Sequence, residues 1–245
     1  PDVFERFFAD FNKKPSDYYS LEKLSPGYRV FFENNEHFDV SDDLNTIISD
    51  FEKIEKGSGK QLEKFISNAK SNYEIAIKDL VYRPGESIFE LFTPQTALKL
   101  DQFFSNIKRD VRKKIKNKNL QQILEFPVLF LGAKPSDTPS FYNFMNYADF
   151  GLGTWKKKNG FFDVIEAMIK LGTELGVTYQ TNSNIEEIIV ENNKAVGIKI
   201  NNEILKSDVV LSGADYHHTE TLLPKENRQY SEGYWAKKTF APSSL

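Results

Sequence analysis

Strand-like sequence fills residues 177–212, directly after a long stretch of helical sequence. Five short segments there are rich in β-branched residues and are separated by turn residues: VTYQT, NIEEIIV, AVGIKI, ILK and DVVLS. The turns ENNK and NNE are short enough to join antiparallel neighbours. The region is therefore expected to form a β-ribbon whose last strand runs into a turn of small residues, SGA.

The preceding part of the chain has the spacing of amphipathic helices. Residues 41–124 are expected to be helical, and in QLEKFISNAKSNYEIAIKDL the apolar positions fall on one face. Residues 28–40 predict a β-hairpin, after which Ser41 is expected to start the first helix. Helices are also expected from Ser136 or Thr138 and over residues 161–171, the latter closed by Gly176. The fold class is therefore expected to be α/β with α+β character, in which a helical insertion separates sheet-forming pieces.

Composition excludes several classes of function. The net charge of −3 gives no electrostatic indication of nucleic-acid binding. The chain has no cysteine, which excludes disulfides and thiolate metal sites. The adjacent pair His217 and His218 would point about 100° apart on a helix, so we expect no metal site there. Neither Gly-x-Ser-x-Gly nor His-Glu-x-x-His occurs, so the sequence does not support a hydrolase or a metalloprotease.

Phenylalanine is frequent, with 21 of 245 residues. Phe carries a large apolar area without a polar tip, so it suits either a core or an apolar binding surface. The longest apolar run, FPVLFLGA, is much shorter than the roughly 18 residues that a membrane-spanning helix needs. No signal peptide is visible, and we expect a cytoplasmic protein.

A basic segment lies within residues 103–118. At helical spacing its apolar positions form one face, and the sequence KRDVRKKIKNK crowds the other sides. Two interpretations stay open. The segment is a helix with a solvated basic face, or it is an interfacial helix that lies on anionic lipid. The apolar positions are Phe103, Phe104, Ile107, Val111 and Ile115.

No complete Gly-x-Gly-x-x-Gly fingerprint occurs in the 245 residues. GLGTWK begins like one, but Lys156 stands where the third glycine belongs, and no strand-like run precedes it. We interpret GLGTWK as a turn of small residues and not as a phosphate loop.

Longer segments resemble a known family. LFLGAKPSDTPSFYNFMNYADFGLGTW, GFFDVIEAMIKLGTELGV and SGADYHHTETLLP, in this order, resemble the bacterial phytoene-desaturase-type carotenoid desaturases. The start, FERFFADFNKKPSDYYSLEKLSPGYRVFF, resembles the first substrate-domain strands of the same family. The β-ribbon region resembles the second FAD-contacting region of the large flavoprotein oxidoreductases, although a generic hairpin unit could share its pattern. The resemblance covers nearly the whole chain and implies an internal fragment of such an enzyme.

The resemblance implies a domain division. Residues 1–40 would be the start of the substrate domain, with a helix and a β-hairpin. Residues 41–124 would be the helical region, for which contact with a membrane stays open. Residues 125–176 would hold substrate-domain helices and a flavin-proximal loop. Residues 177–245 would form part of an FAD-binding, Rossmann-like domain with the β-ribbon.

The resemblance also implies FAD as the cofactor of the full-length enzyme, while the 245 residues alone are not expected to bind FAD tightly. Ile185 occupies the position whose backbone meets adenine in the family, and Ser212, Gly213 and Ala214 occupy the turn near the flavin. In the family pattern Trp-x-Pro-x-Gly-Gly, Lys157 replaces the proline and Asn159 the first glycine. Close approach of that loop to the flavin is therefore in doubt.

The activity implied is dehydrogenation of a long apolar polyene, such as phytoene, by hydride transfer to flavin. Asp149 is the candidate for an acid/base or polar role, against the alternative of a surface carboxylate at a helix end. Phe144, Tyr147 and Trp155 are expected to lie near the substrate. The alternatives are a related carotenoid isomerase, oxygenase or retinol-saturase-like flavoenzyme, or a lipid-binding module without catalysis.

Two further partners are expected. An apolar polyene must be taken from a bilayer, so we expect peripheral contact with a membrane surface, with residues 103–118 as the candidate surface. Strands without neighbours of their own favour self-association of the 245-residue chain.

Overall fold

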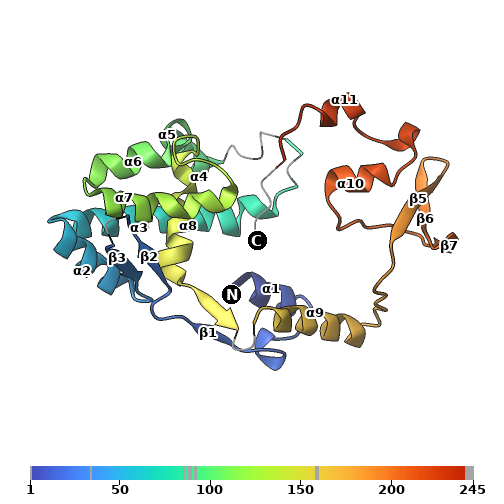
Figure 1. Ribbon diagram of the computed structural model, residues 1–245, viewed down its shortest axis with the longest axis horizontal. Coiled ribbons are helices and arrows are strands. Elements are labelled where there is room, and N and C mark those ends of the chain that lie inside the picture. Colours follow the sequence, from blue (N-terminus) through green and yellow to red (C-terminus); the bar gives the residue numbers. More distant parts are fainter. Residues whose placement is uncertain are drawn as a thin grey trace. The chain divides into compact units, whose positions relative to one another are not determined.

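The computed structural model describes residues 2–33, 35–84, 86–87, 90, 93–157 and 160–240 (Figure 1). The chain divides into two compact units, Pro1–Met168 and Ile169–Leu245. Helix and strand are mixed, so the expected fold class is confirmed. The named strands of the described residues pair only in the antiparallel sense.

The first unit begins with helix α1 (Asp2–Ala9) and holds two small sheets. Strands β2 (Tyr28–Phe31) and β3 (His37–Val40) form the predicted hairpin. The sequence did not predict the second sheet, in which β1 (Leu21–Lys23) pairs with the distant β4 (Trp155–Lys157).

Helices fill the middle of the first unit, and long α3 packs against α2, α8 and η6 (Figure 1). The predicted start at Ser41 lies slightly too early, because the Asp43 side chain caps α2 through the backbone N–H groups of Asn45 and Thr46. The helical elements are α2 (Leu44–Ile54), α3 (Ser58–Lys78), η2 (Leu80–Tyr82), α4 (Pro94–Ala97), α5 (Leu100–Phe104), α6 (Ile107–Lys114), α7 (Lys118–Glu125), η4 (Phe126–Leu131), η5 (Ser140–Asn143), α8 (Phe144–Asn146) and η6 (Tyr147–Leu152).

The core lies between the hairpin and these helices. Phe51, Leu62 and Leu120 are fully buried there, and Phe38 packs edge-on against Phe51. A buried amide joins three elements, because the Asn72 side chain of α3 donates to Gln102 of α5 and to Asn143 of η5. Burial of apolar area at about 25 cal/mol per Å² lets this cluster stabilise the unit.

Residues 103–118 do not form one helix, which corrects the expectation from the sequence. Helix α5 ends at Phe104, the Asn106 side chain caps α6, and the Asn117 side chain caps α7. The carboxylate of Glu55 accepts the backbone N–H groups of Lys116 and Asn117, which fixes the break between α6 and α7. Short polar side chains at these positions satisfy helix-end N–H groups and so favour separate helices.

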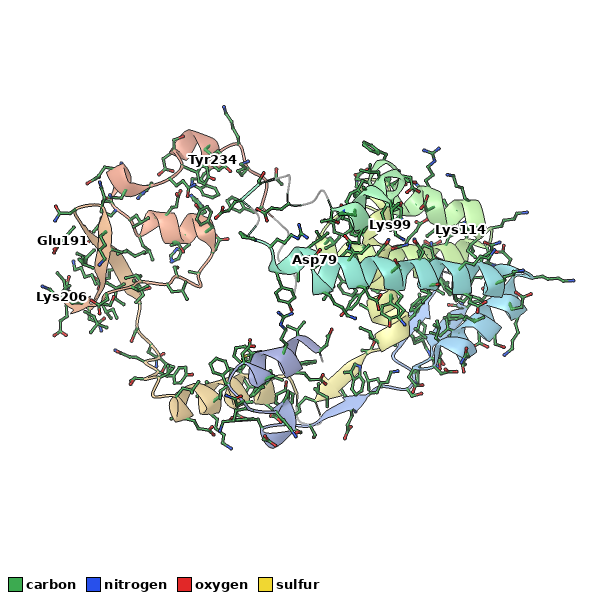
Figure 2. All side chains as sticks on the ribbon, turned by 180° about the vertical axis from the view of Figure 1, so that it is seen from behind. Asp79, Lys99, Lys114, Glu191, Lys206 and Tyr234 are labelled. Carbon is green, nitrogen blue, oxygen red and sulfur yellow. The ribbon has the colours of Figure 1, made fainter. Side chains whose placement is uncertain are left out.

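The apolar face expected for lipid contact is mostly inside the protein. Ile107, Val111 and Ile115 belong to the buried core, whereas Phe104 is 86% exposed. An apolar face that is already buried cannot enter a bilayer, so the interpretation of residues 103–118 as one interfacial helix is wrong. The basic side chains do stay at the surface. Lys114 on α6, labelled in Figure 2, lies with its ammonium nitrogen 5.3 Å from the centre of the Phe65 ring.

Helix α9 (Phe162–Glu174) spans the division between the units and matches its prediction. Gly176 follows with φ +87°, the left-handed conformation expected of a glycine that closes a helix. In the described residues, no helix is both long and apolar enough to span a bilayer.

The second unit holds an antiparallel sheet of order β5-β6-β7, made of β5 (Ile185–Glu191), β6 (Lys194–Ile200) and β7 (Glu203–Lys206) (Figure 1). Asn192 and Asn193 both have positive φ, as two-residue hairpin turns of this kind require. The elements α10 (Tyr216–Thr221), η7 (Lys225–Asn227) and α11 (Glu232–Trp235) follow.

Two strands expected in this region do not form. Residues 177–181 and 208–212 are described without strand structure. Val209 is 78% exposed and Leu211 is 94% exposed, so the apolar side chains of the second segment have little cover within the described chain. A strand needs a neighbour for its backbone hydrogen bonds, and local propensity alone does not supply one.

Candidate functional site

A cavity of about 710 Å³ opens in the first unit, and we call it the central cavity. Strand β2, helix α3 and the helical segments η4, α8 and η6 supply its wall. Most of the lining side chains are aromatic or aliphatic, which gives the cavity an apolar interior. Its lining includes Tyr28, Tyr73, Phe126, Phe130, Phe144 and Met145.

Asp149 and Tyr28 form a hydrogen-bonded pair in the lining of the central cavity. The Tyr28 hydroxyl donates to Asp149 Oδ2 at 2.6 Å, across 121 residues of sequence. Both residues are half-buried, so the alternative of a surface carboxylate for Asp149 does not hold. Burial raises the pKa of the Asp149 carboxyl, and the Tyr28 hydrogen bond partly opposes that rise. Burial, together with the nearby Asp149 charge, raises the pKa of Tyr28 far above its ordinary value.

The local backbone explains how Asp149 reaches the cavity. Asp149 lies in η6, a π-helical turn, and such turns shift side chains away from the regular helical register. Gly151 lies beneath the Tyr147 ring, and a Cβ at that position would come within 2.5 Å of ring atoms. Gly153 then ends the turn with φ +80°, a conformation that glycine adopts without strain.

Two smaller cavities share lining residues with the central cavity. The Leu129 cavity, of about 410 Å³, shares Tyr28, Arg29 and Phe126 with it. The Trp155 cavity, of about 310 Å³, shares Tyr73 with it. Each smaller cavity therefore adjoins the central cavity, to which the Tyr28–Asp149 pair belongs.

The structure divides the predicted substrate-proximal residues between two of these cavities. Phe144 lines the central cavity together with Asp149, whereas Tyr147 and Trp155 line the Trp155 cavity. Tyr73 connects the two groups, since its ring packs edge-on against Tyr147 with centres 5.4 Å apart. Its hydroxyl donates to Asp2 Oδ2 at 2.9 Å, and burial and this bond raise the pKa of Tyr73 to about 12.

The sequence did not single out Tyr28 or Tyr73 as site residues. Tyr28 alternates with Val30 on the half-buried face of β2, so strand periodicity could have placed it toward the interior. No local signal connects Tyr28 with Asp149, because their contact arises only from the tertiary fold.

The predicted cofactor-contacting residues all lie in the second unit. Ile185 begins β5 and is paired with Ile200 of β6. Residues 212–214 form an exposed turn before α10, where the hydroxyls of Ser212 and Thr219 lie 2.7 Å apart. A Cβ built at Gly213 would meet no atom within 4 Å, so the turn is open to a ligand. None of Ile185, Ser212, Gly213 and Ala214 carries a positive charge, so these residues fit only part of a dinucleotide site.

The histidine pair lies in helix α10 of the second unit. The His217 ring lies 4.8 Å from the Trp235 ring, and the His218 backbone N–H donates to the helix-capping carboxylate of Asp215. Within the described residues, no cluster of His, Asp and Glu is arranged to hold a metal ion.

Comparison with known proteins finds relatives that are named as desaturases and a solved structure of an oxidoreductase. No protein-family model matches the chain. A carotenoid 3,4-desaturase of Haloarcula japonica is 37% identical over all of this chain and half of its own length. A phytoene desaturase of Neurospora crassa is 27% identical over 92% of this chain and 40% of its own length. The solved structure of an oxidoreductase from Methanosarcina mazei shares the fold, with a TM-score of 0.51 at 17% identity, over 91% of this chain and 47% of that one.

The chain therefore shares its fold with a solved oxidoreductase. The chain is a homologue of the carotenoid and phytoene desaturases, and the predicted resemblance to the phytoene-desaturase-type family is confirmed. The chain spans about half the length of the curated relatives it matches.

Proposed function

We propose that the full-length protein is an FAD-dependent desaturase that dehydrogenates a long apolar polyene. The observation that carries this proposal is the largely apolar central cavity, with the half-buried carboxyl of Asp149 in its lining. Apolar walls favour a bound hydrocarbon by about 25 cal/mol for each Å² that leaves water. The named activities of the relatives agree with this substrate class.

The residues of the central cavity would have two roles, substrate binding and proton acceptance. Phe126, Phe130 and Phe144 would hold the polyene and exclude water from it. When bound, FAD supplies the oxidant that accepts a hydride from one carbon. Asp149 would accept the proton lost from the neighbouring carbon, whose C–H electron pair becomes the new double bond. A carboxyl whose pKa is raised is a stronger base once ionised, which suits this role.

The second unit would supply a part of the FAD site. We assign the Ile185 backbone to the adenine end, and the turn of Ser212, Gly213 and Ala214 to the flavin end. The exposed hydroxyl and the open Gly213 backbone support this assignment. The phosphate-binding part of the site would come from another segment of the full-length protein, because these residues carry no positive charge.

Membrane contact forms part of the proposal, with a different surface from the one predicted by sequence. The substrate dissolves in bilayers and not in water, so the enzyme must reach a lipid surface. Segment η4 exposes Phe126, Leu129, Phe130 and Leu131, with Phe130 75% exposed, and two of these residues also line the central cavity. We assign η4 to lipid contact and the exposed lysines of α6 to attraction by anionic headgroups. A cytoplasmic enzyme at the membrane surface fits this arrangement.

Self-association of the 245-residue chain is the remaining part of the proposal. The exposed Val209 and Leu211, in a segment of strand-like sequence without a neighbour, support it. Such segments pair readily with other chains. Sedimentation of the 245-residue chain over a range of concentrations tests this statement.

The proposal is tested with the purified full-length protein. A flavin absorption spectrum and desaturated products from phytoene in liposomes are the expected results. Isomerised or oxygenated products would favour a related flavoenzyme, and vesicle binding without flavin or product would favour a lipid-binding module. Either result would contradict the desaturase assignment.

A further inference from the structure

We propose that Tyr28 is a positioning residue for Asp149: its hydroxyl fixes Oδ2 of the carboxyl and leaves Oδ1 as the oxygen that meets a ligand in the central cavity. The contact is 2.6 Å long and joins strand β2 to the π-helical turn η6. A catalytic role for this hydrogen bond rests on the proposed desaturase function. The positioning itself can be measured without any activity.

Tyr28 is held from more than one side. Its backbone pairs with Val40 in the β2–β3 hairpin, and its ring lies 6.2 Å from the Phe126 ring of η4. Phe150, next to Asp149 in the same turn, is buried, and Gly151 packs beneath the Tyr147 ring. Because the donor and the acceptor are both anchored by packing, the hydrogen bond defines the direction of the carboxyl group and does not merely follow a mobile side chain.

The direction of the hydrogen bond is also defined. Burial and the Asp149 charge raise the pKa of Tyr28, so the phenol stays protonated at physiological pH and remains the donor. Asp149 is therefore the acceptor. A hydrogen bond to a carboxylate favours its charged form, so Tyr28 opposes the effect of burial on the pKa of Asp149. Loss of the hydroxyl would leave burial unopposed and raise that pKa further.

The other charged or titratable groups around the cavity have partners of their own. Arg29 makes a two-bond contact with Asp39, the Tyr73 hydroxyl donates to Asp2, and the Lys23 ammonium, which lies close to Gly153, donates to the Asp42 backbone oxygen. For Asp149 itself, the pKa responds to burial and to Tyr28. Tyr28 is thus the group whose removal should change the Asp149 titration.

The test measures the titration of Asp149 in the 245-residue chain labelled with ¹³C in the aspartate carboxyl groups. The D149N variant assigns the signal. In Tyr28→Phe the Asp149 titration should shift upward in pH. Tyr73→Phe is the matched control, because Tyr73 lines the same cavity but gives its hydroxyl to Asp2, and it should leave the Asp149 titration unchanged.

A second variant keeps the inference testable if Tyr28→Phe fails to fold. Replacement of Tyr28 by 3-fluorotyrosine retains the ring and the hydroxyl and makes the phenol a stronger donor. The Asp149 titration should then shift downward in pH, opposite to the phenylalanine variant. A titration that both replacements leave unchanged overturns the positioning role.

Activity of the full-length protein separates this inference from the proposed function. If both hold, Tyr28→Phe lowers kcat about tenfold with little change in KM, and the acidic limb of the pH profile moves to higher pH. If the titration shifts but D149N retains full activity, positioning holds and the catalytic role of Asp149 fails. If the titration does not shift, the inference fails whatever the activity.

Discussion

The ammonium nitrogen of Lys157 lies 2.9 Å from Oδ2 of Asp163, and this ion pair joins strand β4 to the first turn of helix α9. The two side chains are only 10% and 23% exposed, so the pair is largely shielded from water. Lys157 occupies the position of a proline in the family pattern, and its side chain has a structural partner in this chain. Asn159, the second departure from that pattern, lies outside the described residues.

Replacement of Lys157 by alanine should lower the free energy of unfolding by about 2 kcal/mol, because it leaves the half-buried Asp163 carboxylate without its partner. Urea unfolding of the 245-residue chain measures the change. Lys156 is exposed on the same strand and provides the control, since Lys156→Ala should change stability by less than about 0.5 kcal/mol. Equal effects of the two variants would show that the ion pair contributes nothing.

The ionised Asp149 carboxylate should lower the free energy of unfolding, although the proposed reaction needs it. Its folded-state pKa is raised by burial, so the folded state binds the proton more tightly than the unfolded state does. The free energy of unfolding should therefore fall as pH rises through the raised pKa of Asp149. At pH values above that pKa the whole loss should remain. D149N mimics the protonated form and should make the chain more stable at pH 7, with a weaker pH dependence. Thermal unfolding between pH 4 and 8 measures both effects.

In the full-length enzyme the same D149N substitution should lower kcat by roughly 10²- to 10⁴-fold, the range expected when a general base is lost. Product formation from phytoene in liposomes measures the change. A stable D149N enzyme with unchanged kcat would remove Asp149 from the reaction and leave the central cavity as a binding site only.

Local sequence patterns predicted the elements whose stability is mainly local. The β2–β3 hairpin, helices α3 and α9, and strands β5 to β7 all follow from periodicity and turn chemistry. Asn192 and Asn193 illustrate this, because asparagine tolerates the positive φ that a short hairpin turn needs.

Contacts between distant residues could not be predicted in this way. The three-residue pairing of β1 with β4 and the hydrogen bond of Tyr28 to Asp149 depend on the packing of the whole unit. Residues 103–118 do have helical periodicity, but the capping side chains of Asn106 and Asn117 divide the segment. Ile107, Val111 and Ile115 then pack inward, which periodicity alone does not distinguish from lipid contact.

The 245-residue chain should bind no FAD tightly. Its predicted contacts, Ile185 and residues 212–214, offer backbone groups and one hydroxyl, and the sequence contains no complete Gly-x-Gly-x-x-Gly loop for the pyrophosphate. Purified chain should therefore be colourless and should not shift in melting temperature when FAD is added. A yellow preparation with stoichiometric flavin would contradict this prediction.

The last prediction concerns the membrane surface proposed for segment η4. Phe130 is 75% exposed and lines the central cavity, so a bilayer that covers it would lie at an entrance for an apolar substrate. Burial of a Phe side chain contributes about 1.5–3 kcal/mol, so Phe130→Ser should weaken binding of the full-length protein to anionic vesicles at least tenfold. Phe104 on α5 is the matched control, because it is a similarly exposed Phe, at 86%, outside η4. It belongs to residues 103–118, which do not form one interfacial helix. Phe104→Ser should leave vesicle binding unchanged. Charge reversal of Lys108 and Lys113 on α6 should weaken binding at low salt and have little effect at high salt, where headgroup attraction is screened within a few ångströms. Co-sedimentation with vesicles measures all three variants. Release by Phe104→Ser and retention by Phe130→Ser would move the contact away from η4 and back to residues 103–118.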